Sequence, residues 1–309
     1  MDIAIMIEGQ NGLNWPRWKA IARAVEDLGF AGLYRSDHYT NANPPDLDSL
    51  ELWVSLTWLA SHTSRIEFGQ LVSPLSFREP TMLARMAAAV DDLSGGRFHL
   101  GVGAGWQERE HHNFGWDLLP IPPRFDRFEE GLEIISRLLQ DDTPSTFEGK
   151  YYQIRDAILL PHPARVGGPP IVIGGNGPRR TLPLAARFAD EWNAVFLPTT
   201  TFASRNERLD ALLEAQGRDP SDVRRTMMTG LWLGKTHAEL EARAKQRNRT
   251  IADLRDVGLI VGTPADLVEQ LQKLADVGVQ RVMLQWLDLE DLEGLEVLAK
   301  AVLSDFPSA

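Results

Sequence analysis

The chain has 309 residues, of which 43% are hydrophobic and 24% charged, with a formal net charge of -11 and no cysteine. This length can bury a large core, as one big α/β domain or two smaller ones, while the charge argues against nucleic acid or an anionic membrane as the main partner. The absence of cysteine excludes disulfides, thiolate metal sites and cysteine nucleophiles. No apolar run reaches the ~18 residues of a membrane span, and the start, MDIAIMIEGQ, lacks the pattern of a signal peptide. We therefore expect a soluble, cytoplasmic protein.

Apolar strand-like runs alternate with amphipathic helical runs along almost the whole chain. The predicted strands are Ile3–Ile7, Gly32–Arg35, Ile66–Val72, Phe98–Val102, Ile171–Ile173, Trp192–Leu197, Met227–Leu233 and Val282–Trp286. The predicted helices are Trp15–Leu28, Leu50–Ala60, Pro80–Leu93, Asp126–Leu139, Thr181–Ala189, Arg205–Gln216, Leu267–Val277 and Leu292–Leu303. In addition, residues 147–154 resemble a small hairpin, and the polar stretch 236–256 is expected to hold a helix and a variable loop.

This alternation predicts an α/β fold, a (β/α)8 TIM barrel formed by residues 1–309 as a single domain. A doubly wound sheet is the alternative, but it usually stops at fewer strands. The one departure from a minimal barrel is an insertion between strands 4 and 5, which begins with the proline-rich connection LPIPPRF. In barrels of this kind the carboxyl ends of the strands carry the chemistry.

The fifth strand leads into the strongest local signal, the segment PPIVIGGNGPRRTLPLAARFADEWN at residues 169–193. An apolar run stops at a glycine-rich turn, and Pro178 is expected at the first position of the next helix. Unpaired N–H groups and the helix dipole at such a point suit a phosphate, and two arginines add charge. An ordinary turn between strand and helix is the alternative. The residues of this anion site are Gly174, Gly175, Asn176, Gly177, Arg179 and Arg180.

Polar residues also follow the other early strands, so they should gather at one rim of the barrel. Glu8 ends the first strand, Asp37 and His38 follow the second, and Gln70–Ser73 ends the third. His38 is expected to transfer protons because its ordinary pKa lies near ~6.5. In the alternative interpretation, Glu8 and Asp37 only cap a helix or form ion pairs, and Asp37 holds the loop in place.

The fourth strand ends in GVGAGW, which lacks the third glycine of a dinucleotide fingerprint. Its glycines could let a ring system approach the backbone, with Trp106 forming part of the wall, or they could serve barrel packing alone. Adjacent His111 and His112 diverge too far to share a metal easily, so metal catalysis is a remote alternative. Glu8 and Asp37 would also permit glycoside hydrolysis, which leaves the phosphate site unexplained.

Three runs of the sequence resemble the bacterial luciferase-like monooxygenase superfamily, and most closely its branch of coenzyme F420-dependent oxidoreductases. These are SDH at residues 36–38, FGQLVSPLSFREPTMLARMAAAVDDLSGGRFHLGVGAGWQERE at 68–110, and GGNGPRRTLPLAARFADEWN at 174–193. The resemblance covers nearly the whole chain. It implies a barrel that holds a flavin or deazaflavin at its rim, often as a homodimer.

The resemblance also implies roles for individual residues. Asp37 and His38 match the family's Asp-His pair, with His38 near the redox-active carbon, and Glu8 matches an acid of the first strand. Gln70 and Leu71 match a pair joined by a non-proline cis peptide behind the ring. The remaining residues implied to touch the cofactor are Ser73, Gly105, Trp106, Gly174, Gly175, Asn176 and Gly177. The sugar-phosphate dehydrogenases of the branch carry a catalytic glutamate where Trp106 stands, so that activity is not expected.

The two cofactors predict different chemistry. With coenzyme F420 the protein would be an enzyme transferring hydride to or from a small organic substrate, whereas reduced FMN would make it a monooxygenase that uses oxygen. Arg165, Arg179 and Arg180 are the basic residues expected to meet the deazaflavin's polyglutamate tail. F420 is the cofactor expected here, FMN the alternative. A barrel that has lost activity and serves only binding or structure is a further alternative. Aromatic residues that could shape the substrate site, or belong to the core, are Trp15, Tyr39, Trp106, His111, Phe114 and Trp286.

Overall fold

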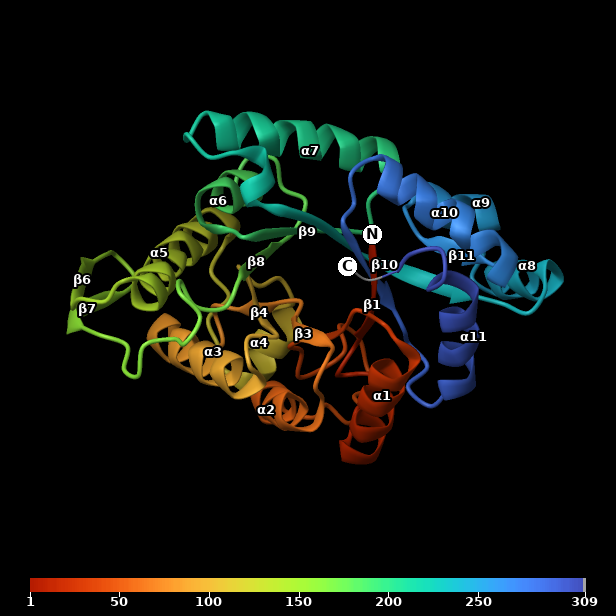
Figure 1. The fold of residues 1–309 in the computed structure, drawn as a ribbon, viewed down its shortest axis with the longest axis horizontal. Helices are drawn as coiled ribbons and strands as arrows, with labels where there is room; N and C mark the ends of the chain where they lie inside the picture. The colour runs from red at the N-terminus through yellow and green to blue at the C-terminus, as the bar shows by residue number, and fades with distance from the viewer. Residues whose placement is uncertain (308–309) are drawn as a thin grey trace.

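A closed barrel of eight parallel strands forms the centre of the computed structural model, which describes residues 1–307 (Figure 1). Each strand pairs with its neighbour in parallel register, for example Ala4 with Gly32 and Met227 with Ala194, and the pairing of β9 with β10 closes the ring. The strands are β1 (Asp2–Ile7), β2 (Gly32–Arg35), β3 (Glu67–Gln70), β5 (Phe98–Gly103), β8 (Ile171–Gly174), β9 (Glu191–Val195), β10 (Arg224–Leu233) and β12 (Arg281–Gln285).

Helices surround the strands and bury their apolar stripes against them. In α1, Asn14 caps the first turn by accepting from the N–H of Arg17 at 3.2 Å, and Gly29 ends the helix at a φ of 95°. The large core between helices and strands includes Trp18 and Trp192, both fully buried. The barrel's helices are α1 (Trp15–Leu28), α2 (Leu52–His62), α3 (Pro80–Ser94), α5 (Ile121–Gln140), α6 (Thr181–Phe188), α7 (Thr199–Glu214), α10 (Pro264–Asp276) and α11 (Leu292–Val302).

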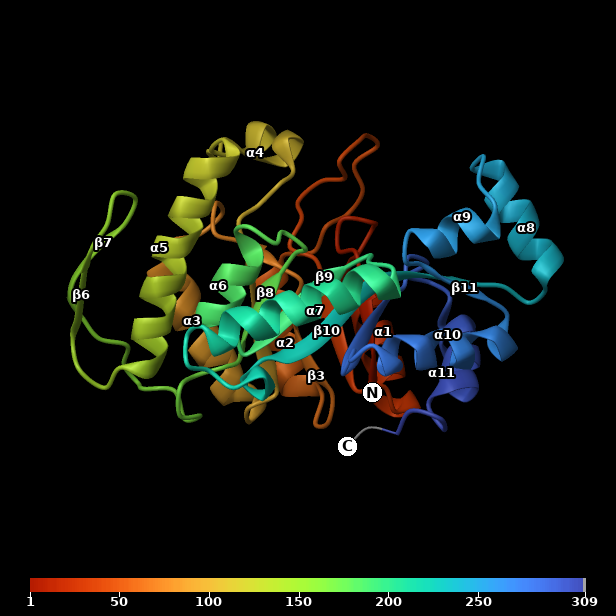
Figure 2. The same ribbon diagram turned by 90° about the horizontal axis from the view of Figure 1, so that it is seen from above.

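Two additions depart from the minimal barrel. The first, between β5 and β8, confirms the predicted insertion: it adds α4 (Glu108–Phe114) and a hairpin of β6 (Ser145–Glu148) and β7 (Gln153–Ala157) to the barrel helix α5. The second follows β10 and was not expected as an insertion. It consists of α8 (His237–Gln246), α9 (Ile251–Asp256) and β11 (Ile260–Gly262), which pairs with β10. Figure 2 shows α4 and α8 on the side of the molecule opposite both termini.

The remaining short elements are β4 (Ser73–Pro74), which pairs with the end of β5, and the 3-10 turn Pro220–Asp222. Within residues 1–307, no helix combines the length and apolar character needed to cross a bilayer.

All eight predicted barrel strands are confirmed, but three local predictions are wrong. Pro178 does not begin a helix: residues 178–180 form a turn and α6 begins at Thr181. The proline-rich connection is largely helical, since prolines are tolerated in the first turn of α5. The non-proline cis peptide joins Leu71 to Val72, one residue beyond the expected pair Gln70 and Leu71.

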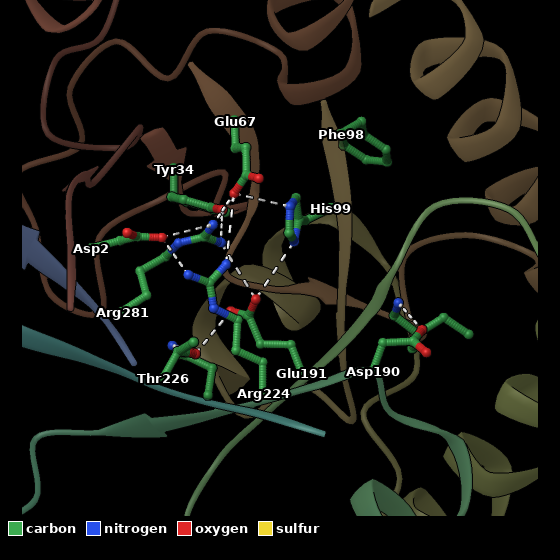
Figure 3. A network of polar contacts seen from close by, with 12 residues as sticks. Asp2, Tyr34, Glu67, Phe98, His99, Asp190, Glu191, Arg224, Thr226 and Arg281 are labelled. Atoms are coloured by element: carbon green, nitrogen blue, oxygen red, sulfur yellow. Dashed lines mark hydrogen bonds and ion pairs between the residues drawn. The ribbon is translucent and has the colours of Figure 1, made fainter. Parts of the chain in front are cut away.

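The amino end of the barrel is filled by a network of charged side chains (Figure 3). Arg281, fully buried, lies 3.4 Å from the carboxylate of Glu191, pairs with Glu67, and donates to the Tyr34 hydroxyl at 2.6 Å. His99 lies between the two glutamates, 3.3 Å from Glu67 and 3.5 Å from Glu191. Each of the two glutamates faces a cation, so their charges are neutralised within the network. These side chains therefore fill the amino end of the barrel and are not available to ligands.

Candidate active site at the carboxyl rim

The rim at the other end is centred on a pair formed by His38 and Glu110. His38 follows β2, and Glu110 lies in the first turn of α4, 72 residues later in the chain. The Nδ1 atom of His38 lies 2.8 Å from Oε1 of Glu110, and Oε2 of the same carboxylate accepts from the N–H of Tyr39 at 3.0 Å. Both oxygens of Glu110 therefore hold the loop after β2, and the imidazole keeps Nε2 for another partner.

Burial and charge act on this pair in opposite directions. Burial alone would lower the pKa of His38, but the hydrogen bond and charge of Glu110, with Glu8 and Asp37 behind them, raise it above its ordinary value. Burial would raise the pKa of Glu110, but the bond from His38 and that from the Tyr39 N–H lower it. Each member of the pair therefore favours the charged form of the other.

Asp37 has a positioning role in this structure. Its Oδ2 accepts from Ser73 Oγ at 2.7 Å and forms an ion pair with Arg78, whose other guanidinium nitrogen lies 3.3 Å from Oδ1. This side chain is buried and tied to the segments after β3, so it fixes the loop that carries His38. Ser73, predicted to touch the cofactor, is itself fully buried in this contact.

Glu8 lies on the same rim and is held by two amides. Gln10 donates to it at 3.0 Å and Gln285, at the end of β12, donates at 2.7 Å. Its charge contributes to the raised pKa of His38, so the structure brings Glu8, Asp37 and His38 together as predicted.

The glycine turn after β8 is anchored by Asn176. Its amide donates to the carbonyl of Val195 at 2.7 Å and accepts from the N–H of the same residue at 2.9 Å, which ties the loop to β9. Gly175 adopts a φ of 124° and its carbonyl accepts from Trp192 Nε1 at 2.8 Å. A side chain on Gly177 would meet Thr181, since its Cβ would lie 2.9 Å from Oγ1.

This anchoring leaves backbone donors unpaired. Within residues 1–307, the N–H groups of Asn176, Gly177, Arg179 and Arg180 have no acceptor. Successive unpaired N–H groups in a turn ahead of a helix form a concave site for an oxyanion. The loop therefore fits the phosphate of a flavin or deazaflavin through its backbone, whereas the Asn176 side chain is occupied.

The charges around this loop differ from the prediction. Arg180 is paired with Asp126 and stacked on Phe125, whereas Arg179 is exposed. Arg205 of α7, which sequence reasoning missed, donates to the Asn176 carbonyl at 3.2 Å. Arg165 does not reach the loop: it binds Asp91 and the Gly96 carbonyl in the turn before β5, at the other end of that strand.

The glycines of GVGAGW are explained by packing. A Cβ on Gly101 would lie 1.8 Å from the Gln70 carbonyl oxygen, and one on Gly103 would lie 2.5 Å from a methyl of Val72. A Cβ on Gly174 would lie 3.0 Å from the other methyl of Val72. The absence of side chains at these three glycines therefore leaves room for Val72 between β5 and β8. The segment after β3 thereby contributes an apolar side chain near the rim, at Val72.

Gln70, Gly105 and Trp106 have different environments. The Gln70 side chain is fully buried and, by strand alternation, shares the face of Phe68, whereas Leu71 packs inside the barrel. Gly105, at a φ of 85°, accepts a hydrogen bond from Arg124 at 3.0 Å. Trp106 is 63% exposed and lies edge-on to His38, with 5.5 Å between ring centroids, so it forms one side of the space around this imidazole.

The aromatic residues singled out in the sequence divide between rim and core. Tyr39 and Phe114 form one cluster with Phe77 and Trp116, and His111 joins it through Phe77. The pKa of His111 is lowered by burial, and its Nε2 lies 2.7 Å from Ser76 Oγ. By contrast, Trp15 packs on Trp58 of α2, and Trp286 is buried.

Glu110 is the main functional residue that sequence reasoning missed. The run EREHHN offered several acids and two histidines, and nothing local showed which one reaches the loop after β2. Arg78 was missed for the same reason. In the described part of the chain, no three His, Asp or Glu side chains are grouped so as to hold a metal ion.

Taken together, the fold and the rim define a (β/α)8-barrel protein that carries a hydrogen-bonded His38–Glu110 pair and a turn with unpaired backbone N–H groups at the carboxyl ends of its strands. The family model described as luciferase-like monooxygenase matches residues 1–257. The chain belongs to this family.

Relatives of two kinds resemble the chain. It is 28% identical over 295 residues to the pyrimidine monooxygenase RutA of Agrobacterium fabrum, which covers 82% of this chain and 78% of that protein. It is 29% identical over 202 residues to a putative coenzyme F420-dependent oxidoreductase of Mycobacterium tuberculosis, covering 62% of this chain and 54% of that protein. In several curated relatives the match spans about half of the relative's length.

Among solved structures, an F420-dependent secondary alcohol dehydrogenase in complex with an F420-acetone adduct superposes with a TM-score of 0.85. The match covers 97% of this chain and 98% of that one at 18% identity, so it establishes the shared barrel fold.

Proposed function

We propose that this protein is an F420-dependent oxidoreductase that transfers a hydride between the deazaflavin and a small organic substrate. The observation that carries the proposal is the shared rim: the His38–Glu110 pair and the unpaired N–H groups after β8 lie at the carboxyl ends of strands of one barrel. The similarity to the putative F420-dependent oxidoreductase supports the choice of cofactor.

Separate groups of residues would bind the cofactor phosphate, border its ring and exclude water. The N–H groups of Gly177 and its neighbours would hold the cofactor phosphate, and Leu71 and Val72 would form an apolar wall beside the ring. When bound, the deazaflavin would supply a carbon centre that donates or accepts hydride. Trp106 would help exclude water from the space next to His38.

His38 would move the accompanying proton. As an imidazolium it donates Nδ1–H to Glu110 and presents Nε2–H to a substrate carbonyl oxygen, which becomes a hydroxyl as its carbon gains the hydride. In the reverse direction neutral Nε2 takes the hydroxyl proton while the substrate C–H bond breaks. Glu110 keeps one tautomer and stabilises the charged form, which is the usual contribution of a carboxylate behind a catalytic imidazole.

A second candidate function is an FMNH2-dependent monooxygenase that uses molecular oxygen. It is favoured by the similarity to pyrimidine monooxygenase RutA, which extends over most of both chains. The same phosphate loop would serve FMN, because both cofactors carry a phosphate.

Equilibrium titration of the purified apoprotein with F420 and with FMN separates the two functions. We expect tighter binding of F420, and hydride transfer to a carbonyl acceptor without oxygen. Clear preference for FMN, together with oxygen consumption, would overturn the F420 proposal and establish the second function. A single active site per chain is expected; a homodimer remains a prediction that sedimentation would check.

A further inference from the structure

A cavity of about 300 Å³ lies between the end of β10 and the second insertion. Its wall is largely apolar, but it also holds one amide and two guanidinium groups. The lining residues include Phe196, Trp232, Arg247, Arg249, Leu259 and Gln285. Nothing in the proton-transfer pair or the phosphate loop uses these two arginines.

Among the residues that the structure describes, neither arginine of the cavity forms a salt bridge, although the charge of Arg249 contributes to lowering the pKa of Asp253. Within residues 1–307, neither Arg247 nor Arg249 has a carboxylate within 4.0 Å, although the chain as a whole carries a net charge of -11. The guanidinium carbon of Arg247 lies 4.9 Å from the centroid of Trp232, which sits in the small core of the second insertion. Stacking on a fixed ring orients Arg247 at the cavity wall and leaves its N–H groups for a ligand.

Gln285 connects this cavity to the reaction centre. The Nε2 amide of Gln285 donates to Glu8 at 2.7 Å. The charge of Glu8 in turn helps raise the pKa of His38. A molecule in the cavity would therefore border the rim where we place proton transfer.

We infer that this cavity binds the anionic end of the substrate, and that the substrate is a small organic acid with a flat apolar body. This inference deepens the proposed function. It rests on that function in naming the bound molecule a substrate, whereas the evidence for a binding site comes from the cavity alone. The size fits the lower range of small-molecule pockets, the apolar lining suits a ring, and two forked guanidinium groups match a carboxylate or phosphate.

The test is calorimetric titration of the whole protein, without cofactor, with three probes: benzoate, phenyl phosphate and the neutral benzyl alcohol. We expect the two anions to bind at least tenfold more tightly than the alcohol, with affinity falling as salt rises. The stronger of the two anions identifies the head group. Equal binding of anion and alcohol, or no binding of any probe, would overturn the inference.

Variants assign the binding to this cavity. We expect Arg247→Gln and Arg249→Gln each to weaken anion binding about tenfold. The matched control is Arg243→Gln, because Arg243 also lies over Trp232, at 5.2 Å, but binds the Leu233 carbonyl and does not line the cavity. The anion affinity of Arg243→Gln should differ from that of the unaltered protein by less than about twofold.

Unchanged anion affinity in both cavity variants, or equal loss in the control, would contradict the site. Because all three arginines lie on the exposed second insertion, thermal unfolding should stay the same, which separates lost binding from lost folding. The cofactor titration is independent of these measurements: anion binding without F420 or FMN binding would refute the proposed function alone, and the reverse result would refute this site alone.

Discussion

The two ends of the barrel both bury a carboxylate beside a cation, but the cation differs. At the amino end the partner of Glu191 and Glu67 is the guanidinium of Arg281, which offers donors only and accepts no hydrogen bond. At the carboxyl rim the partner of Glu110 is His38, an imidazole that can both donate and accept a proton and whose pKa this carboxylate raises. The same kind of pair therefore serves closure at one end and is suited to proton transfer at the other.

The largest effect is expected from breaking the amino-end network. Arg281→Met should lower the free energy of unfolding by about 3–5 kcal/mol, because it removes the guanidinium that faces both buried Glu191 and partly exposed Glu67 and leaves Glu191 only its longer contact with His99. Urea denaturation measures this loss. The control is Lys300→Met, which breaks an exposed pair with Glu296 and should change stability by less than about 0.5 kcal/mol. A loss below about 1 kcal/mol for Arg281→Met would mean that the network does not hold the barrel end.

At the rim, His38→Ala should reduce turnover about a hundredfold, since a positioned acid–base group typically contributes at least this much. Cofactor affinity should change little, because the phosphate loop is on other strands. His62→Ala, at an exposed histidine of α2, is the control and should keep full activity. Equal turnover of His38→Ala and the unaltered protein would remove this residue from the mechanism.

Glu110→Gln tests whether the carboxylate at the rim controls the pKa of His38. Without the carboxylate, burial dominates and the pKa of His38 should fall, so the corresponding limb of the rate profile should move to lower pH. In the unaltered protein the raised pKa of His38 stabilises the fold below its unfolded pKa of ~6.5, and this contribution disappears as pH rises through the folded value. The difference in melting temperature between protein and variant should therefore be larger at pH 6 than at pH 9. A rate profile that stays in place would show that Glu110 does not govern the proton on His38.

The smallest effect concerns the arginines after the glycine turn. Arg179→Gln should weaken FMN or F420 binding about threefold to tenfold, because this exposed side chain is available to an anion. Arg180→Gln should change it less than about twofold, since Arg180 is already paired with Asp126. Fluorescence titration of the cofactor gives both constants. The reverse order of the two variants would show that the ion pair opens on binding.

Much of this molecule follows from local sequence pattern. Alternation of apolar runs gave all eight barrel strands, because each must bury one face in the barrel and the other under a helix. The rim position of Glu8, Asp37 and His38 followed from the rule that strand ends meet at one face. The glycines after β8 predict an anion site, and the structure has unpaired N–H groups in that turn among the described residues.

Long-range partners could not be predicted in this way. Glu110 reaches His38 only because α4 folds back over the rim, and Arg165 is drawn to Asp91 at the opposite end of β5. Helix α6 begins at Thr181 and not at Pro178, because residues 178–180 form a turn ahead of it. In the second insertion the helix expected in residues 236–256 is confirmed, but strand β11 was not predicted, because its three residues are too few for a periodic signal.

The double hydrogen bond between Asn176 and the backbone of Val195 has a consequence for the kinetics of cofactor capture. A turn fastened to two adjacent strands loses little chain freedom when a phosphate arrives, so its donors are already oriented. Recognition should then proceed as docking into a rigid receptor, with an association rate nearly independent of loop motion. Asn176→Ala would convert it to a slower, two-phase process visible by stopped-flow mixing.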